Sequence, residues 1–374
     1  MSVGFGIVGS GLMAGVYANA LADDTLNTRF VGVTVGTRAP GLAEKFGVEH
    51  IGSFEDMLAR PDVDALVLAT PHSAHLPETL AAAAAGKHVF LEKPMGLNKA
   101  ECRQMIEACR AAGVILTVGQ VTRRMEAPRI AKQMVDAGEI GDVRMIEAWR
   151  GIDGGLARSL GEGSWALDPH EGGPFLDWGS HGCDVVRWYA GGEPTLAFGV
   201  SKGFDPETPL DETTMAQLVF DNGVFAHIWM TYELPHAVLG TRARYLLVGS
   251  KGILDVHAYG QLRQSTGPEG GRSEATWGVP TTPTVSGAAS ALAQPAGWQT
   301  VYESSDWVDA DAGWGYPSAY MRQGFARQVQ DFTDAIAGGG QLEVTGEDGL
   351  RAVEMVQAVQ RSAAIGQAVR LPLD

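Results

Sequence analysis

The sequence predicts an α/β protein of two domains, in which a parallel sheet covered by helices precedes an α/β domain with a large, open, mainly antiparallel sheet. Its length of 374 residues suits two domains, because one domain usually takes roughly 100–200 residues. Short apolar runs alternate with helical patterns up to about residue 120, and longer runs with interspersed polar residues follow. We therefore expect the first domain at residues 1–123 and the second at residues 124–374.

The first domain contains short apolar runs that predict strands at residues 3–8, 30–35, 65–69, 88–91 and 114–118. Helical patterns separate these runs, at residues 12–22, 42–46, 54–58, 76–85 and 99–112. The apolar runs do not alternate with polar residues, which is typical of strands covered on both faces. Strands and helices that alternate in this way predict a parallel sheet with right-handed crossovers.

The second domain begins with a helical pattern and continues mainly as strands. The helix is expected at residues 130–137, and the strands at residues 143–149, 196–201, 213–220, 223–232, 243–249 and 252–258. Asp221-Asn222-Gly223 predicts a hairpin turn, which favours antiparallel pairing. Two helices, at residues 320–336 and 348–365, are expected to close the chain.

The segment 259–317 is rich in Gly, Pro, Ser and Thr, and it predicts a long loop insertion. Loops of this length are usually either functional or disordered. Four tryptophans favour ordered packing of the segment, namely Trp277, Trp298, Trp307 and Trp314.

Composition excludes several classes of protein. The 44 acidic residues outnumber the 28 lysines and arginines, and the net charge of −16 would repel nucleic acid. Cys102, Cys109 and Cys183 form no CxxC pair, so we expect reduced thiols. We find neither a basic leader with a cleavage site nor an apolar stretch of the roughly 18 residues that a membrane helix needs. These observations favour a cytoplasmic protein without a membrane partner.

Residues 9–14, Gly-Ser-Gly-Leu-Met-Ala, form a GxGxxA turn between a predicted strand and a predicted helix. In that context small residues let a pyrophosphate approach the unpaired N–H groups at the helix N-terminus. The alternative is an ordinary tight turn. We therefore expect a Rossmann-type dinucleotide site that includes Gly9, Gly11, Leu12, Met13 and Ala14.

The end of the second strand, Val35-Gly36-Thr37-Arg38, lacks the Asp or Glu that usually binds the ribose hydroxyls of NAD. Arg38 is suited to pair with the 2′-phosphate of NADP and to stack on adenine. Thr37 or the backbone of Gly36 would then hydrogen-bond the phosphate. The loop favours NADP, with NAD as the alternative, and Arg38 as an ordinary solvated residue is the other interpretation.

Glu92-Lys93-Pro94 follows the fourth predicted strand, so Lys93 is expected at the carboxyl edge of the parallel sheet. Ligands bind at that edge in open parallel sheets. A lysine there can donate a hydrogen bond to an oxygen that gains negative charge during a reaction. The alternative is a surface turn.

Asp177, His181, Asp184 and Arg187 have the spacing of one helix face, and Gly172-Gly173-Pro174 predicts a turn before that helix. A histidine with a nearby aspartate suits general acid–base chemistry near pH 7. The alternative is a polar helix face with incidental ion pairs. We predict no metal site, because no second set of His or Cys accompanies these residues.

Together these motifs resemble the Gfo/Idh/MocA oxidoreductases, a family named for glucose–fructose oxidoreductase, inositol dehydrogenase and a rhizopine-catabolism protein. The resemblance covers nearly the whole chain, and it includes Thr70-Pro71 with His75 and Asp348-Gly349 at the last helix. It implies a Rossmann domain followed by an α/β domain whose open sheet face mediates oligomer contacts. A homodimer or homotetramer is therefore expected.

The resemblance also implies roles for individual residues. Lys93, Asp177 and His181 would form the catalytic set. The nicotinamide end of the cofactor would be lined by Thr70, Pro71, His75 and Glu92, with His72, Lys93 and Gln120 as further cofactor-binding candidates.

We expect hydride transfer between NADP and a secondary alcohol or ketone of a sugar, sugar derivative or cyclic polyol. His181 would exchange the hydroxyl proton, Lys93 would stabilise the partial alkoxide, and Asp177 would hold the substrate hydroxyl or tune His181. Further substrate contacts are expected among Arg123, Trp149, Trp165, His170 and Trp178, each of which has packing as its alternative role. An anionic substrate group would need Arg123, Arg124 or Arg158.

Two rival functions stay open. A glycosidase or lyase of the same fold would oxidise its sugar transiently with tightly held NAD, which Thr37-Arg38 disfavours. A non-catalytic sensor would bind dinucleotide to regulate a partner protein, but it would not need Lys93, Asp177 and His181 together.

Overall fold

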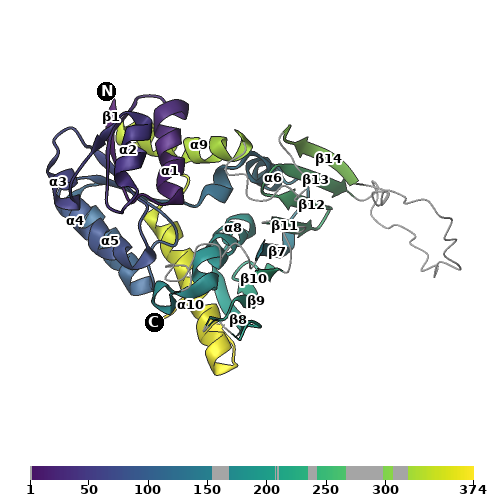
Figure 1. The fold of residues 1–374 in the computed structure, drawn as a ribbon. Helices are drawn as coiled ribbons and strands as arrows, with labels where there is room; N and C mark the ends of the chain where they lie inside the picture. Colours follow the sequence, from purple (N-terminus) through teal and green to yellow (C-terminus); the bar gives the residue numbers. More distant parts are fainter. Residues whose placement is uncertain are drawn as a thin grey trace, which may run out of the picture.

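The computed structural model describes residues 2–153, 168–206, 208, 210–234, 242–266, 298–305 and 319–374. In this part of the chain two sheets form, one in each half of the sequence (Figure 1). Helices lie on both sides of the first sheet, whereas α6, α8 and α10 pack against the second. The predicted fold class, a Rossmann-type domain followed by an α/β domain with an open sheet, is confirmed.

All neighbouring strands of the first sheet are parallel, in the order β3-β2-β1-β4-β5-β6. Their apolar side chains are buried on both faces, which explains the absence of alternation in the sequence. The strands are β1 (Val3–Val8), β2 (Thr28–Thr34), β3 (Glu49–His50), β4 (Ala65–Leu68), β5 (His88–Leu91) and β6 (Leu116–Val118). The helices are α1 (Leu12–Asn19), η1 (Ala20–Asp24), α2 (Ala39–Phe46), α3 (Phe54–Ala59), η2 (His72–Ala74), α4 (His75–Ala84), α5 (Lys99–Ala112), η3 (Val121–Arg124) and α6 (Glu126–Asp136).

Local chemistry sets several of these boundaries. The strand β2 ends at Thr34 because Val35 has φ 66°, a left-handed conformation that β-branched residues rarely adopt. The helix α5 begins where Asn98 accepts a hydrogen bond from the Glu101 N–H at 3.0 Å. We expected a helix to begin at residue 130, but α6 begins at Glu126. The earlier start is possible because Pro128 fits the first turn of a helix.

The second sheet has the order β14-β13-β12-β11-β7-β10-β9-β8-β15. Its pairs are antiparallel except for β7 with β10, so the sheet is mixed and mostly antiparallel. The strands are β7 (Val143–Asp153), β8 (Pro194–Lys202), β9 (Thr213–Phe220), β10 (Phe225–Leu234), β11 (Arg242–Gly249), β12 (Gly252–His257), β13 (Gln261–Thr266), β14 (Trp298–Glu303) and β15 (Val369–Arg370). The helices are η5 (Pro169–Glu171), η6 (Phe175–Gly179), α8 (Ser180–Ala190), α9 (Ala319–Ile336) and α10 (Gly346–Ile365).

The segment 259–317 contributes two strands that we did not expect. Near its start β13 pairs with β12, and β14 then adds to the edge of the sheet, beginning at Trp298. The ring of Trp298 lies 5.1 Å from the guanidinium carbon of Arg263. The other tryptophans of the segment, Trp277, Trp307 and Trp314, lie outside the described residues.

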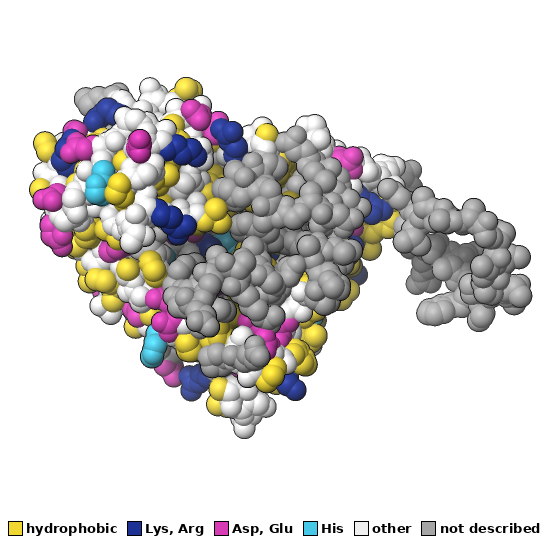
Figure 2. Space-filling model, viewed as in Figure 1, with side chains coloured by type: hydrophobic (Ala, Val, Ile, Leu, Met, Phe, Trp, Pro, Cys, Tyr) yellow, Lys and Arg dark blue, Asp and Glu magenta, His cyan; other side chains and the backbone are white. Residues whose placement is uncertain are grey.

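The two C-terminal helices connect the sheets. The helix α9 follows the second sheet in sequence, yet it packs against α1, η1 and β5 of the first half, and α10 contacts α5 and β6 as well as α8 and β8. Over the N-terminal half, acidic and basic side chains are interspersed on the face shown in Figure 2. Among the described helices, none combines the length and apolarity needed to span a bilayer.

A buried ion-pair network also joins the halves. Arg123 of η3 is 4% exposed and holds Asp184 of α8 through Nε at 2.8 Å and Nη2 at 2.5 Å. Asp348 of α10 lies 3.3 Å from Arg123 and 2.8 Å from Arg187. Three segments that are far apart in the sequence therefore share one network of charges.

We predict that Asp184→Ala lowers the free energy of unfolding by about 3–5 kcal/mol, because it removes the bidentate partner of a buried guanidinium. Urea denaturation followed by tryptophan fluorescence measures this loss, and the double variant Arg123→Met/Asp184→Leu should recover most of it. As a control, Arg110→Ala breaks the exposed pair with Glu347 and should cost less than about 1 kcal/mol. Equal losses in the two single variants would contradict the structural role of the network.

Candidate active site

An ion pair between Lys93 and Asp177 joins the edge of the parallel sheet to the segment that precedes α8. Lys93 follows β5 at the carboxyl edge of the parallel sheet, and Asp177 lies in the π-turn η6. Nζ of Lys93 is 2.5 Å from Oδ1 of Asp177 and 3.2 Å from its backbone carbonyl oxygen. Both side chains are largely buried, at 13% and 10% exposure, so each charge depends on the other for compensation.

Two further side chains surround the Asp177 carboxylate. The hydroxyl of Tyr232 on β10 donates to Oδ2 at 2.7 Å, and Nε2 of His72 lies 3.7 Å from Oδ1. Burial opposes ionisation, but the charge of Lys93 and the hydrogen bonds outweigh it and hold the pKa of Asp177 below its usual value. The group is therefore a carboxylate at neutral pH. Sequence analysis missed Tyr232, whose place in an apolar strand gives no functional signal.

His181 lies in the first turn of α8, buried and in edge contact with the ring of Trp178 at 6.4 Å. Its Nδ1 atom is buried without a hydrogen-bond partner. Burial, with the charges of Arg150 and Lys93, lowers the pKa of His181 well below its ordinary value, so the imidazole is neutral at pH 7. Among the described residues no hydrogen bond joins Asp177 to His181, because Asp177 instead binds Lys93 and Tyr232.

The predicted helix face is divided between two environments. Asp177 and His181 lie near Lys93, whereas Asp184 and Arg187 belong to the interior network of Arg123. Because the π-turn η6 precedes α8, Asp177 does not continue the regular α-helical spacing that the sequence suggested. Arg123 is thus bound by Asp184 as part of a structural ion-pair network. The expectation that Arg123 contacts substrate is not supported.

The glycine-rich turn forms an open cradle at the start of α1. Gly9 has φ 110°, and a Cβ there would collide with the carbonyl of Ala69, whereas a Cβ on Gly11 would meet open space. The first turn of α1 has neither a side-chain cap nor an acidic residue, which leaves the N–H groups of this turn available to a ligand. Ala14 is buried and Leu12 is half exposed. These features fit the pyrophosphate of a dinucleotide.

The loop after β2 lies directly on this turn. Val35 and Gly36 both have positive φ, and a Cβ on Gly36 would collide with the Ser10 hydroxyl. Thr37 and Arg38 follow with exposed side chains, and Arg38 is the N-cap residue of α2. Strain of this kind in a β-branched residue is typical of functional loops.

Polar side chains anchor the loops at the predicted nicotinamide end. The hydroxyl of Thr70 donates to Glu78 at 2.6 Å, and burial raises the pKa of Glu78 to about 7. The ring of His75 lies between the carbonyls of Pro94, 2.9 Å from Nδ1, and Thr70, 3.1 Å from Nε2. Burial, with the neighbouring His72, lowers the pKa of His75 to about 3. His75 thus connects two loops at the sheet edge.

Glu92 and Gln120 are buried at the same edge. Glu92 accepts a hydrogen bond from the hydroxyl of Tyr17 and another from the N–H of Lys93 at 3.0 Å. Oε1 of Gln120 is buried without a partner, and unsatisfied buried oxygens of this kind are rare in folded proteins. Pro71 is the N-cap residue of η2.

His72 contacts the second half of the chain. Its Nδ1 donates to the carbonyl of Glu171 at 2.8 Å, and the neighbouring Ser73 donates to the Glu171 carboxylate through its N–H at 2.9 Å and its hydroxyl at 2.6 Å. With Nε2 near Oδ1 of Asp177, His72 lies beside the carboxylate that pairs with Lys93. Sequence analysis had assigned it to the cofactor.

Trp149 is the clearest correction among the predicted substrate contacts. On β7 the side chains of Ile146, Ala148 and Arg150 are buried, so Trp149 belongs to the opposite, open face. There its ring stacks on that of Trp229 at 5.3 Å and 19°. The alternation of the strand therefore separates Trp149 from His181, because α8 covers the other face.

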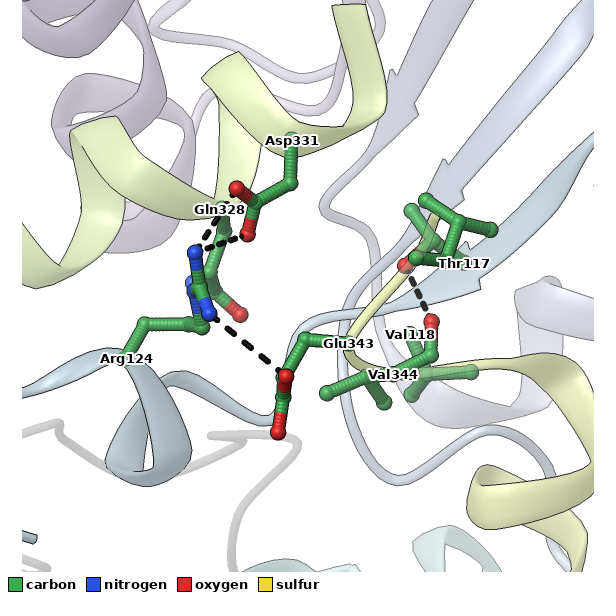
Figure 3. Close-up of a pocket in the computed structure, with 8 residues that line it drawn as sticks. Thr117, Val118, Arg124, Gln328, Asp331, Glu343 and Val344 are labelled. Carbon is green, nitrogen blue, oxygen red and sulfur yellow. Dashed lines mark hydrogen bonds and ion pairs between the residues drawn. The ribbon is translucent and has the colours of Figure 1, made fainter. Parts of the chain in front are cut away.

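The remaining candidates have different positions. Trp178 contacts the rings of both His181 and Tyr232, whereas His170 is exposed in η5. Arg124 pairs with Asp331 at 2.5 Å in a small cavity that residues of α9 and β6 help to line (Figure 3). Trp165 and Arg158 lie outside the described residues.

Comparison with known families explains this combination of sheets and motifs. Residues 3–120 match the model of an oxidoreductase family with an NAD-binding Rossmann fold, and residues 129–255 match the Gfo/Idh/MocA C-terminal domain. The chain belongs to the Gfo/Idh/MocA family. The resemblance inferred from its motifs is confirmed, and the chain is an oxidoreductase with an NAD-binding Rossmann domain.

Similar members of the Gfo/Idh/MocA family act on sugars and diols. A 1,5-anhydro-D-fructose reductase from Ensifer adhaerens is 28% identical over 90% of this chain and 89% of its own length. A trans-1,2-dihydrobenzene-1,2-diol dehydrogenase from Mus musculus is 31% identical over 60% of this chain and 67% of its own. A levoglucosan dehydrogenase solved with NADH and levoglucosan shares the fold, with a TM-score of 0.80, 21% identity and full coverage of both chains.

We predict that the imidazole of His181 does not titrate between pH 6 and 8 in the free protein, because its pKa is lowered by burial and neighbouring cations. Lys93→Met removes one cation and leaves the Asp177 carboxylate, so it should move the titration midpoint of the His181 imidazole to higher pH. NMR of the ring C–H resonances measures this, and the spectrum of His181→Ala assigns the signal. A midpoint at or above about 6.5 in the unchanged protein would contradict the described electrostatics.

Proposed function

We propose that the chain is an NAD(P)-dependent dehydrogenase or reductase that acts on a secondary alcohol or ketone of a sugar, sugar derivative or cyclic polyol. One observation carries the proposal: Lys93 and Asp177 form a buried pair at the carboxyl edge of the Rossmann sheet, within electrostatic reach of His181. Relatives named as a 1,5-anhydro-D-fructose reductase and a scyllo-inositol 2-dehydrogenase support the substrate class.

The residues at the sheet edge fit a nicotinamide dinucleotide, which when bound would accept or supply the hydride. Gly9, Gly11 and the N-terminus of α1 would hold its pyrophosphate through backbone N–H groups. The unpartnered amide oxygen of Gln120 and the loop of Thr70 would face its nicotinamide end.

The three catalytic side chains would have separate roles in proton transfer and in stabilising charge. In oxidation the neutral imidazole of His181 takes the hydroxyl proton, and in reduction the protonated ring returns it. The ammonium of Lys93 donates to the substrate oxygen as negative charge develops there. Asp177 holds the Lys93 side chain in place through their 2.5 Å contact. A neutral His181 favours proton abstraction in the free enzyme, because the ring is already unprotonated.

A second copy of this chain is the proposed partner. Exposed apolar side chains gather on the open face of the second sheet, where Trp149 stacks on Trp229. They are Met145, Phe198, Val200, Met215 and Phe225. An apolar surface of this kind is typical of an interface between subunits.

The catalytic assignment predicts that His181→Ala and Lys93→Met each lower kcat/KM by about 10²–10³-fold. The substrate is first identified by a screen of sugars and polyols with NADP and NAD in parallel. The absorbance of the reduced coenzyme measures turnover in that screen. His50→Ala and Lys251→Met, at exposed positions, are the controls and should leave kcat/KM unchanged. Turnover within a few-fold of the unchanged enzyme in both catalytic variants would end the assignment. A copurifying NAD with no net absorbance change would instead favour the glycosidase or lyase.

The loop after β2 has no carboxylate and exposes Arg38, which supports NADP as the preferred coenzyme, with Arg38 as the partner of the 2′-phosphate. Arg38→Ser should lower kcat/KM for NADP about 10- to 100-fold and leave NAD unaffected, because a hydrogen bond to a charged group contributes about 1.5–3 kcal/mol. Arg103→Ser, at an exposed position of α5, is the control. An unchanged NADP to NAD ratio, or tight binding of NAD alone, would refute this role of Arg38.

A further inference from the structure

Arg150 of β7 places a buried guanidinium beside the catalytic residues, although its side chain is only 2% exposed. Its Nη1 donates to the hydroxyl of Tyr245 at 2.7 Å, and the hydroxyl of Tyr259 also lies against it. The guanidinium carbon is 5.2 Å from the centre of the Trp178 ring. The Nε atom is buried and has no hydrogen-bond partner. Arg150 is therefore surrounded by aromatic side chains and left with an unused donor.

Arg123 and Arg150 are the two buried arginines among the described residues, and of these two only Arg123 has a carboxylate as counter-ion. Arg123 holds Asp184, and Arg244 holds Asp255 at 2.6 and 2.9 Å, each through the edge formed by Nε and Nη2. No carboxylate of the described residues lies within ion-pair distance of Arg150. Burying an unpaired charge is costly, so an arginine kept in this state is suited to a partner that the described residues do not supply.

The position of Arg150 connects that missing partner with the reaction. The helix α8 packs on β7, and the Arg150 side chain runs beside Gly182, the residue that follows His181. Its charge acts directly on the His181 ring. The charge of Lys93 is compensated by Asp177, which leaves Arg150 as the uncompensated charge of this described cluster.

We propose that Arg150 binds a carboxylate of the substrate through its Nε edge, so that the substrate is a hydroxylated carboxylic acid such as a uronic or aldonic acid. This inference rests on the proposed function and names the substrate class of the same site. A planar guanidinium edge matches a planar carboxylate in bidentate geometry. Phosphate groups are more often held by several donors or by a helix N-terminus, neither of which accompanies Arg150 among its described contacts.

A bound carboxylate also has a consequence for catalysis. It offsets the charge of Arg150, which is one cause of the low pKa of His181. The imidazole then holds a proton more readily when the acid is bound than when the site is free. Arg150 thus serves both to select the substrate and to prepare the acid–base residue for it.

Kinetics with paired substrates tests this inference. Each probe acid is compared with its neutral parent sugar: D-glucuronate and D-gluconate with D-glucose, and D-galacturonate with D-galactose. We expect kcat/KM at least about tenfold higher for the acid of the best pair, and a loss of that preference by about 10- to 100-fold in Arg150→Met. Arg150→Lys keeps the charge without the bidentate edge and should restore part of it. Arg144→Met, exposed near the start of the same strand, should leave the preference unchanged.

Binding to an inactive variant separates this inference from the proposed function. In His181→Ala, calorimetric titration with D-glucuronate, D-gluconate and D-galacturonate should show binding of at least one acid, which the added change Arg150→Met weakens at least about tenfold. Binding that depends on Arg150 without turnover of any sugar would leave the inference standing and refute the proposed function. Turnover of neutral sugars with equal effects of Arg150→Met on acid and neutral probes would refute the inference alone. A preference for D-glucose 6-phosphate over the acids would also overturn it.

Discussion

The buried contact between Lys93 and Asp177 is the interaction on which the rest of the site depends. Neither charge is stable in an interior environment alone, so the ammonium from the Rossmann sheet edge and the carboxylate from the π-turn η6 must meet. Tyr232 fixes the second carboxylate oxygen from a third element. The geometry of the site is therefore set by charge compensation between the halves of the chain.

A second network of charges, formed by Arg123, Asp184 and Asp348, stabilises the arrangement of the helices around the site. The C-terminal helix α10 follows the second sheet in sequence but packs on α5 and β6 of the first half, and its Asp348 joins the Arg123–Asp184 pair. This network lies at the junction of η3, α8 and α10, so it holds the helix that carries His181. Asp184 thus stabilises the helix next to Lys93 and Asp177 through its ion pair with Arg123.

The site combines one compensated cation, a neutral imidazole and one uncompensated cation. This arrangement is costly for folding, because both His181 and Arg150 are buried with unpartnered nitrogen atoms. Such costs are typical of functional sites, where the ligand supplies what the protein lacks. The buried face of β7 is otherwise apolar, with Ala148 and Ile152 on either side of Arg150, while Trp149 lies on the open face.

The sequence by itself determined the parallel sheet, the GxGxxA turn, the position of Lys93 after β5 and the Asp177–His181 block, because turn chemistry and periodicity act over a few residues. Tertiary structure alone decided that Arg123 is bound by Asp184, that Tyr232 and Arg150 join the site, and that β13 and β14 extend the sheet. Which face of a strand is covered, and which ion finds which partner, depends on residues far away in the chain: Arg123 and Asp348 are 225 positions apart. No local pattern encodes such a distance.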